Sequence, residues 1–182
     1  SDGMKMQGYN GSQLWDTAFA AQAFNATGLG HEFKEMVTKA YNYIDITQVR
    51  ENATNGDAYY RHISKGAWPF STVDHGWPIS DCTAEGFRAA LLAPRVNKFL
   101  TPLSDDRYED AVNVMLSYQN PDGGWPTYEL KRSGDFMEYL NPAECFDGIM
   151  VDYSYVECTS ACVRSMLEFQ KLYPEHRKKE IE

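Results

Sequence analysis

The stretch Trp77-Pro78-Ile79-Ser80-Asp81-Cys82-Thr83-Ala84-Glu85 carries the most information in this sequence. It places an aspartate beside a cysteine at the predicted start of a helix, directly after a segment rich in aromatic residues. Burial disfavours the charged form of a carboxyl group, so a carboxyl in apolar surroundings can stay protonated near neutral pH. Asp81 is therefore a candidate Brønsted acid. The ordinary alternative is that Asp81 only caps the helix that begins near Thr83, because aspartate is common at that position.

Three stretches have apolar residues at the spacing of an amphipathic helix. One runs from about Glu32 to Thr47, one follows Ser104, whose hydroxyl we expect to cap it, and one ends before Pro174. No segment shows convincing strand periodicity, so we predict an all-α protein. The three apolar stripes are Phe33, Val37, Ala40 and Ile44; Tyr108, Ala111, Val112 and Met115; and Tyr155, Cys158, Cys162, Met166 and Phe169.

A weak internal repeat organises these helices. The segments Trp15-Asp16-Thr17-Ala18, Asp81-Cys82-Thr83-Ala84 and Glu157-Cys158-Thr159-Ser160 each open a helix of small and apolar residues, and a more polar amphipathic helix follows the first two. Small residues suit crowded inner helices, and amphipathic helices suit an outer ring. The pattern predicts part of an α/α toroid. Its connections, Gly66-Ala67-Trp68-Pro69-Phe70 and Gly124-Trp125-Pro126-Thr127-Tyr128, contain glycine and proline that can hold the aromatic rings in fixed positions.

The composition argues against several functions. The chain has 17 basic and 26 acidic residues, a net charge of −9, and no basic stripe, so we expect no nucleic-acid partner. No apolar run approaches the roughly 20 residues that span a bilayer. Aromatic residues make up 14% of the chain, which indicates either core packing or a cavity lined with ring faces. The cysteines lack paired Cys-x-x-Cys spacing, so we predict reduced thiols and no metal site; they are Cys82, Cys145, Cys158 and Cys162.

Three segments resemble motifs of the oxidosqualene cyclases. Asp81-Cys82-Thr83-Ala84-Glu85 matches their Asp-Cys-Thr-Ala-Glu signature without a gap, and Tyr155-Val156-Glu157-Cys158-Thr159-Ser160 resembles a second motif. The segment from Gln119 to Trp125 resembles the Gln-to-Trp repeat of triterpene cyclases, in which we expect the glutamine to cap a neighbouring helix and the tryptophan to stack on the polar link. The resemblance covers nearly the whole chain. It implies the α/α toroid of terpenoid cyclases and protein prenyltransferases.

The resemblance also implies that residues 1–182 are an internal piece of a longer enzyme. They would form part of its C-terminal catalytic α/α-barrel domain, without the N-terminal domain and the last helices of the toroid. We therefore expect the piece alone to be inactive. The complete enzyme is expected to be monotopic, on the endoplasmic reticulum membrane or on lipid droplets, because its substrate is a C30 hydrocarbon of low solubility.

Members of the family cyclise (3S)-2,3-oxidosqualene to sterol and triterpene skeletons and need no cofactor. By resemblance, Asp81 protonates the epoxide, and Cys82 and Cys158 donate hydrogen bonds to the Asp81 carboxyl. Glu85 is interpreted either as a surface charge or as part of the route that returns the proton. The rings assigned to face the carbocation are Trp15, Phe70 and Tyr128, although for each ring alone core packing is the default.

The product is predicted from three further positions. The combination of Tyr9, His75 and Ile79 resembles the cycloartenol synthases, whereas lanosterol synthases usually differ at all three. Isoleucine is larger than valine by one methylene, and a tyrosine and histidine pair can position or accept a proton. Ile149 matches a position near the constriction of the substrate channel, with a core isoleucine as the alternative.

Other functions stay open at this point. Lanosterol synthase or another triterpene cyclase is the first alternative. A squalene cyclase usually has Asp-Xaa-Asp-Asp where Cys82 and Thr83 here follow Asp81. A protein prenyltransferase needs a zinc site, for which no ligand set stands out. A non-catalytic helical-repeat module would bind its ligand unchanged after Asp81→Asn.

Overall fold

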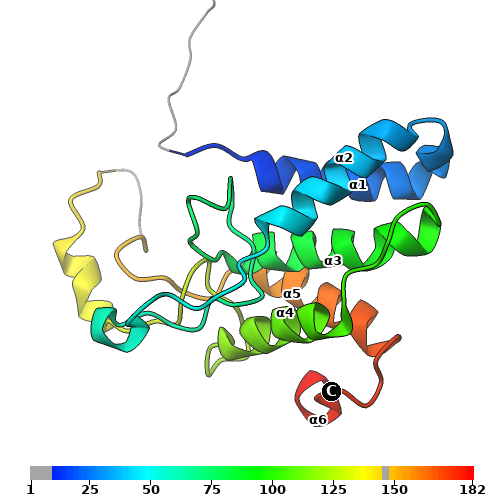
Figure 1. The fold of residues 1–182 in the computed structure, drawn as a ribbon. Coiled ribbons are helices and arrows are strands. Elements are labelled where there is room, and N and C mark those ends of the chain that lie inside the picture. The colour runs from blue at the N-terminus through cyan, green and yellow to red at the C-terminus, as the bar shows by residue number, and fades with distance from the viewer. Residues whose placement is uncertain (1–9, 145–147) are drawn as a thin grey trace, which may run out of the picture.

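The computed structural model describes residues 10–144 and 148–182, and its regular elements are helices (Figure 1). Within these two ranges the sole strand-like pairing is an isolated bridge between Trp125 and Tyr155, so the predicted all-α class is confirmed. The helices are α1 (Gln13–Thr27), α2 (Lys34–Thr47), α3 (Ser80–Val96), α4 (Asp105–Ser117), α5 (Val156–Gln170) and α6 (Lys178–Ile181), with short 3-10 helices η1 (Leu29–His31), η2 (Gly56–Tyr59) and η3 (Asp135–Leu140).

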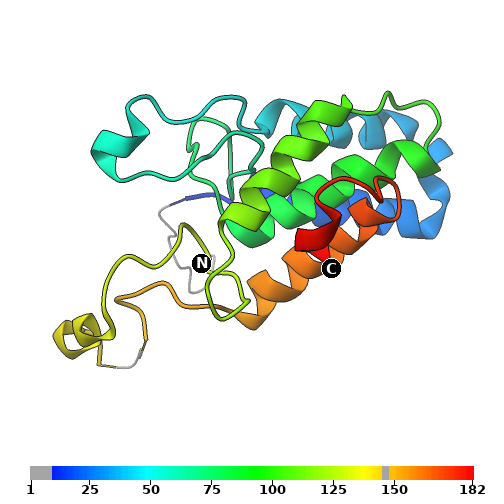
Figure 2. The same ribbon diagram turned by 90° about the horizontal axis from the view of Figure 1, so that it is seen from below.

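The helices form an inner and an outer layer. Helices α1, α3 and α5 lie side by side and run in the same direction, while α2 and α4 run back along their outer side (Figures 1 and 2). Helix α3 is central and packs against α1, α2, α4 and α5. The predicted alternation of inner and outer helices is confirmed for these elements. Its consequence for the site is that α1, α3 and α5 all begin at the same end of the molecule.

The predicted apolar stripes mostly coincide with buried faces. All four stripe residues of α4 are buried, as are the four of α5 that lie within the helix. The assignment of Phe33 to the buried stripe is wrong, because Phe33 precedes α2 and is 40% exposed. Its ring packs against the ring of Phe24. Tyr41 takes part in the buried face of α2, while Ala40 is only partly buried. Ser104 is at the N-cap of α4 as predicted, but its hydroxyl does not bond to the backbone there.

Two equivalent joints connect the outer helices to the inner ones. In the first joint, the backbone N–H of Trp68 donates to the hydroxyl of Thr83 at 3.0 Å. The indole N–H of Trp68 donates to the carbonyl of Ile44, in the last turn of α2, at 2.8 Å. The carbonyl of Trp68 accepts the N–H of Ile79, which precedes α3. One buried tryptophan thus binds the end of an outer helix to the start of an inner helix.

The second joint repeats this bonding. The backbone N–H of Trp125 donates to Thr159 at 3.0 Å, and its indole donates to the carbonyl of Met115 in α4 at 2.7 Å. The carbonyl of Trp125 accepts the N–H of Tyr155, which precedes α5. The two joints confirm the internal repeat. They correct one expectation for the second joint, where the indole of Trp125, and not Gln119, reaches the outer helix. In the first joint, the Gln48 side chain does bond to Arg107 in the first turn of the outer helix α4.

The Gln-to-Trp motif is present in two copies. The first copy, from Gln48 to Trp68, is interrupted by a loop, and the second runs from Gln119 to Trp125. The side-chain amide of Gln119 donates to the carbonyl of Gly123, and that of Gln48 donates to the carbonyl of Gly66, each at 3.0 Å. Both glycines have positive φ angles, +95° for Gly66 and +87° for Gly123, a conformation that favours glycine. In the first copy, residues 50–65 form a loop between Val49 and Gly66, which pair through their backbones at 2.8 Å.

Candidate functional site

Asp81 lies in the first turn of α3, at the end of the molecule where the inner helices begin. Its Oδ1 accepts the backbone N–H of Cys82 at 2.7 Å, while the N-cap position belongs to Ile79. Asp81 therefore accepts a first-turn N–H from inside the helix instead of from the N-cap position, and its role as an acid stays a prediction. The side chain is partly buried, so it contacts the protein interior and remains accessible from one side.

The surroundings of Asp81 favour its neutral form. Burial raises the pKa of the Asp81 carboxyl, and the negative charge of Glu85 raises it further, against hydrogen bonds from Cys82 that lower it. Burial and the nearby Asp81 charge raise the pKa of the Cys82 thiol far above its ordinary value. Cys82 therefore stays a neutral S–H group, which can donate a weak hydrogen bond to the carboxyl.

Helix α5 brings two further thiols to this turn. Cys158 is 3% exposed, and its burial together with the charge of Asp81 raises its pKa to about 11. Cys162 is fully buried and its Sγ lies 3.6 Å from the carbonyl oxygen of Ser80. The Cys82 thiol hydrogen-bonds with the Asp81 carboxyl, whereas the Cys158 thiol hydrogen-bonds with Ser80 and Thr127 and is influenced by the charge of Asp81. Cys162 follows Cys158 by one helical turn. Cys145 lies outside the described residues.

Glu85 is a buried charge. Its side chain is 4% exposed, so the interpretation as a surface charge is wrong. The amide of Gln22 in α1 donates to Oε2 of Glu85 at 2.7 Å, and Arg88 donates to the side-chain Oε1 of Gln22 at 2.7 Å. Arg88 also lies 3.8 Å from Glu85. Sequence reasoning did not identify Gln22, because its bond to Glu85 joins α1 to α3, and it did not identify Arg88, although Arg88 is three residues from Glu85 on the same helix.

The three rings predicted to face a cation are all partly exposed, unlike the buried Trp68 and Trp125. Trp15 stacks on Phe70, with ring centroids 5.9 Å apart and an interplanar angle of 27°. Tyr128 packs edge-on against Trp77 at 6.1 Å. The rings therefore form two pairs, both at the end of the molecule where the inner helices begin.

A pocket of about 500 Å³ lies beside Tyr128. Trp77 and Asp152 were not among the predicted site residues, although Trp77 belongs to the same stretch as Asp81. Arg61 from the loop 50–65 covers one face of Trp77, with its guanidinium 4.2 Å from the ring centroid. Glu129 fixes that arginine with an ion pair at 2.7 Å. The pocket lining consists of His75, Trp77, Tyr128, Glu129 and Asp152.

The remaining predicted positions are distributed as follows. His75 is exposed and lines this pocket, and Ile79 is 4% exposed in the hydrophobic core directly before α3. Tyr9 lies outside the described residues. Ile149 is 55% exposed, which is incompatible with the core alternative within the described chain.

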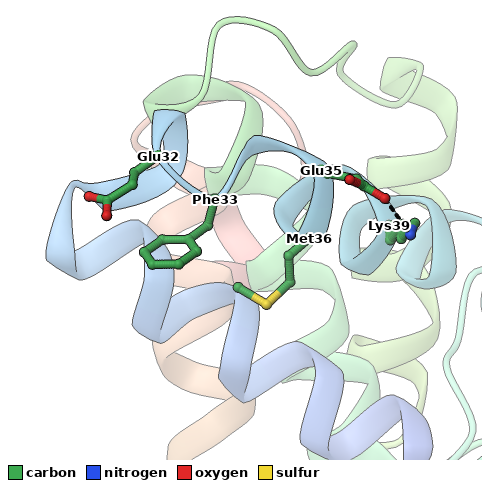
Figure 3. Close-up of a pocket in the computed structure, with 5 residues that line it drawn as sticks. All are labelled: Glu32, Phe33, Glu35, Met36 and Lys39. Atoms are coloured by element: carbon green, nitrogen blue, oxygen red, sulfur yellow. Dashed lines mark hydrogen bonds and ion pairs between the residues drawn. The ribbon is translucent and has the colours of Figure 1, made fainter.

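A second pocket, of about 400 Å³, lies at the start of α2 (Figure 3). Phe33 and Met36 point along one wall, and Glu35 forms a 2.6 Å ion pair with Lys39 one turn further on. None of the predicted site residues lines this pocket. It therefore has no connection to the acid or to the paired rings.

Residues 10–144 and 148–182 contain neither a membrane-spanning helix nor a cluster of metal ligands. Helices of the length and apolarity needed to cross a bilayer are absent from these residues. The same part of the chain holds no group of three or more histidine, cysteine, aspartate or glutamate side chains placed to bind a metal ion.

The chain belongs to the squalene-hopene cyclase C-terminal domain family, whose model matches residues 11–181. Its helices are therefore part of an α/α toroid. The chain is 58% identical over 181 residues to the cycloartenol synthase of Dictyostelium discoideum and 50% identical over 183 residues to the lanosterol synthase of Homo sapiens. It is 40% identical over 183 residues to the alpha-onocerin synthase LCD of Lycopodium clavatum. These alignments cover 99% of this chain and 26%, 25% and 24% of the relatives, so the chain spans about a quarter of their length.

Proposed function

We propose that the protein containing this chain is an isomerase that cyclises (3S)-2,3-oxidosqualene to a sterol precursor, with cycloartenol as the product. The observation that carries this proposal is the environment of Asp81. The carboxyl is partly buried, its pKa is raised by burial, and the buried neutral thiol of Cys82 adjoins it. The relatives named cycloartenol synthase and lanosterol synthase support the same reaction class.

In the proposed first step, the Asp81 carboxyl transfers its proton to the epoxide oxygen. The C–O bond of the epoxide then breaks and leaves positive charge on carbon. Asp81 becomes a carboxylate at this moment, and hydrogen bonds from Cys82 and Cys158 stabilise the developing negative charge. Thiols suit this role because they donate weakly and do not remove the proton of the carboxyl beforehand.

The cation then migrates through a hydrocarbon that forms no hydrogen bonds. Ring faces stabilise such a cation by roughly 0.5–2 kcal/mol each when water is excluded, and they do not trap it as a nucleophile would. We assign this role to Trp15, Phe70 and Tyr128. A proton lost from the last cation ends the sequence, so substrate and product are isomers.

We also propose that the complete enzyme is monotopic on the endoplasmic reticulum membrane or on lipid droplets, with Ile149 near the entry channel. In support, Ile149 is half-exposed and η3 carries Phe136, Tyr139 and Leu140, which are 65%, 92% and 65% exposed. Apolar side chains exposed to this extent favour contact with a hydrocarbon phase or with another part of the protein.

The first prediction concerns the product. The full-length protein that carries this chain should convert (3S)-2,3-oxidosqualene mainly to cycloartenol, as measured by gas chromatography with mass spectrometry. Lanosterol as the main product would contradict the product assignment and leave the cyclase assignment intact. Binding of oxidosqualene without turnover would favour the non-catalytic helical-repeat module.

The second prediction concerns Ile79. Ile79→Val removes one methylene from a buried position two residues before Asp81, so we expect a small loss of stability, about 0.5–1.5 kcal/mol, and a changed ratio of cyclised products. Ile44→Val is the matched control, because Ile44 is fully buried in α2. It should cost similar stability without altering the ratio. Identical ratios for the two variants would contradict the steric role of Ile79.

A further inference from the structure

We propose that Asp152 is a positioning residue that fixes the Tyr128 ring in the pocket wall and couples its place to the first turn of α3. This inference deepens the proposed function and rests on it, because Tyr128 has its role only if a carbocation forms in the pocket. Asp152 lies three residues after Ile149, in the stretch from which the channel position was predicted, but it was given no role of its own.

Both oxygens of Asp152 bind consecutive backbone N–H groups. Oδ1 accepts the N–H of Thr127 at 3.1 Å, and Oδ2 accepts the N–H of Tyr128 at 2.7 Å. Hydrogen bonds to a charged acceptor are stronger than those between neutral groups. A single carboxylate that holds two successive peptide groups fixes the backbone direction at Tyr128. It therefore also fixes the direction in which the ring leaves the chain.

The same segment is held from its other side by α3. The carbonyl of Thr127 accepts the N–H of Ser80 at 2.8 Å, and the carbonyl of Pro126 accepts the hydroxyl of Ser80. Ser80 directly precedes Asp81. Residues 126–128 are thus bound by Asp152 through their N–H groups and by the start of α3 through their carbonyls. Because Asp152 also lies shortly before α5, it connects the ring, the acid and the thiol of Cys158.

Asp152 lines the same pocket as Tyr128 and is only partly buried, so its carboxyl faces whatever occupies the pocket. Burial raises the pKa of this carboxyl, and the hydrogen bonds from Tyr128 and Thr127 lower it and so favour the carboxylate. A free carboxylate would be a hazard beside a carbocation, because it could capture the cation as a nucleophile. The two N–H donors occupy one lone pair on each oxygen and reduce this reactivity. The arrangement therefore keeps both oxygens of this carboxyl engaged near the ring.

The test uses Asp152→Asn in the full-length enzyme with (3S)-2,3-oxidosqualene as the substrate. The amide replaces one acceptor with an NH₂ group that faces a backbone donor, so the peptide of either Thr127 or Tyr128 loses its partner. We expect substrate consumption to fall by less than about tenfold, while the share of incompletely cyclised products rises about fivefold or more, because small displacements of a positioned group alter individual steps strongly. Tyr128→Ala should give the same products, and the double variant should add no further change.

The matched control is Asp122→Asn. Asp122 also accepts a backbone N–H, from Gly124 at 2.9 Å, and the hydroxyl of Ser154 at 2.8 Å, but it is exposed and does not line this pocket. Its product distribution should equal that of the parent. If Asp152→Asn fails to fold, Asp152→Glu keeps the charge and both acceptors on a longer side chain, and should give a smaller shift in the same direction.

An active Asp152 variant with the parental product distribution, or one that only lowers the total rate, overturns the inference and leaves the proposed function intact. The absence of turnover in the unmodified full-length protein refutes the proposed function, and the inference with it. The two failures are therefore distinguished by the parent enzyme in the same assay.

Discussion

Asp81→Asn is expected to lower the turnover of (3S)-2,3-oxidosqualene by the full-length protein about 10³-fold, within the 10²–10⁴ range of general acid catalysis. An amide cannot give up a proton to the epoxide. Its oxygen can still accept the N–H of Cys82, so the first turn of α3 should be preserved. Single-turnover kinetics measure the loss. Retention of more than a tenth of the parental rate would exclude Asp81 as the acid.

The same variant makes a prediction about stability and pH. The folded state raises the pKa of Asp81 above its ordinary value of 3.8. Between this ordinary pKa and the raised pKa, the folded state therefore binds more protons than the unfolded state. The contribution of Asp81 to stability therefore falls as pH rises through this window. Asparagine does not titrate. The difference in Tm between the variant and the parent should therefore be more favourable to the variant at pH 7 than at about pH 3.

The matched control has the opposite sign. Hydrogen bonds from Gly124 and Ser154 lower the pKa of the exposed Asp122. Because its pKa is lowered, Asp122 stabilises the fold in its charged form. Asp122→Asn should lose Tm relative to the parent on going from about pH 3 to pH 7. Equal pH responses of the two variants would show that the burial of Asp81 does not favour its neutral form.

Trp68→Ala is expected to weaken folding by about 3–5 kcal/mol, the cost of truncating a large buried aromatic side chain. The ring is fully buried, packs against Gly86, and holds the carbonyl of Ile44 through its indole N–H. Because the second joint repeats this bonding, Trp125→Ala should cost a similar amount. The urea midpoint of the 182-residue chain, followed by circular dichroism, measures both effects.

Trp68→Phe is the control for this prediction. It keeps an aromatic ring and removes the indole N–H, so it should cost less than the alanine variant. If the alanine and phenylalanine variants unfold at the parental midpoint, the tryptophan joint does not stabilise the packing of α2 on α3.

Much of the fold could be predicted because its signals are local. The apolar spacing of α4 and α5 and the small residues of the inner helices are visible in short windows. The environment of Asp81 could be predicted because the motif is contiguous and Cys158 lies in a motif of its own. The first Gln-to-Trp motif was missed because residues 50–65 separate Gln48 from Gly66, and only the folded backbone brings them together.

The parts of the site that escaped prediction depend on long-range contacts. Gln22 meets Glu85 across 63 positions in the sequence, and Asp152 meets Tyr128 across 24. A charged residue in an isolated sequence is usually read as exposed, which is why the burial of Glu85 was not decided. The expected cap at Ser104 failed for a related reason, since its hydroxyl bonds with the side chain of Asp106 instead of the helix backbone.

The interrupted motif leaves this domain family a segment that can vary in length. Val49 and Gly66 are hydrogen-bonded at the base of the loop 50–65, so a change in the length of the loop does not alter how α2 packs on α3. The loop nevertheless delivers Arg61 to the face of Trp77 at the pocket wall. Insertions or deletions before Arg61 would therefore remodel the wall while Ile63 and Lys65 keep the end of the loop bonded to Tyr118 and Asp110, which makes the tip of the loop a graft point for directed evolution.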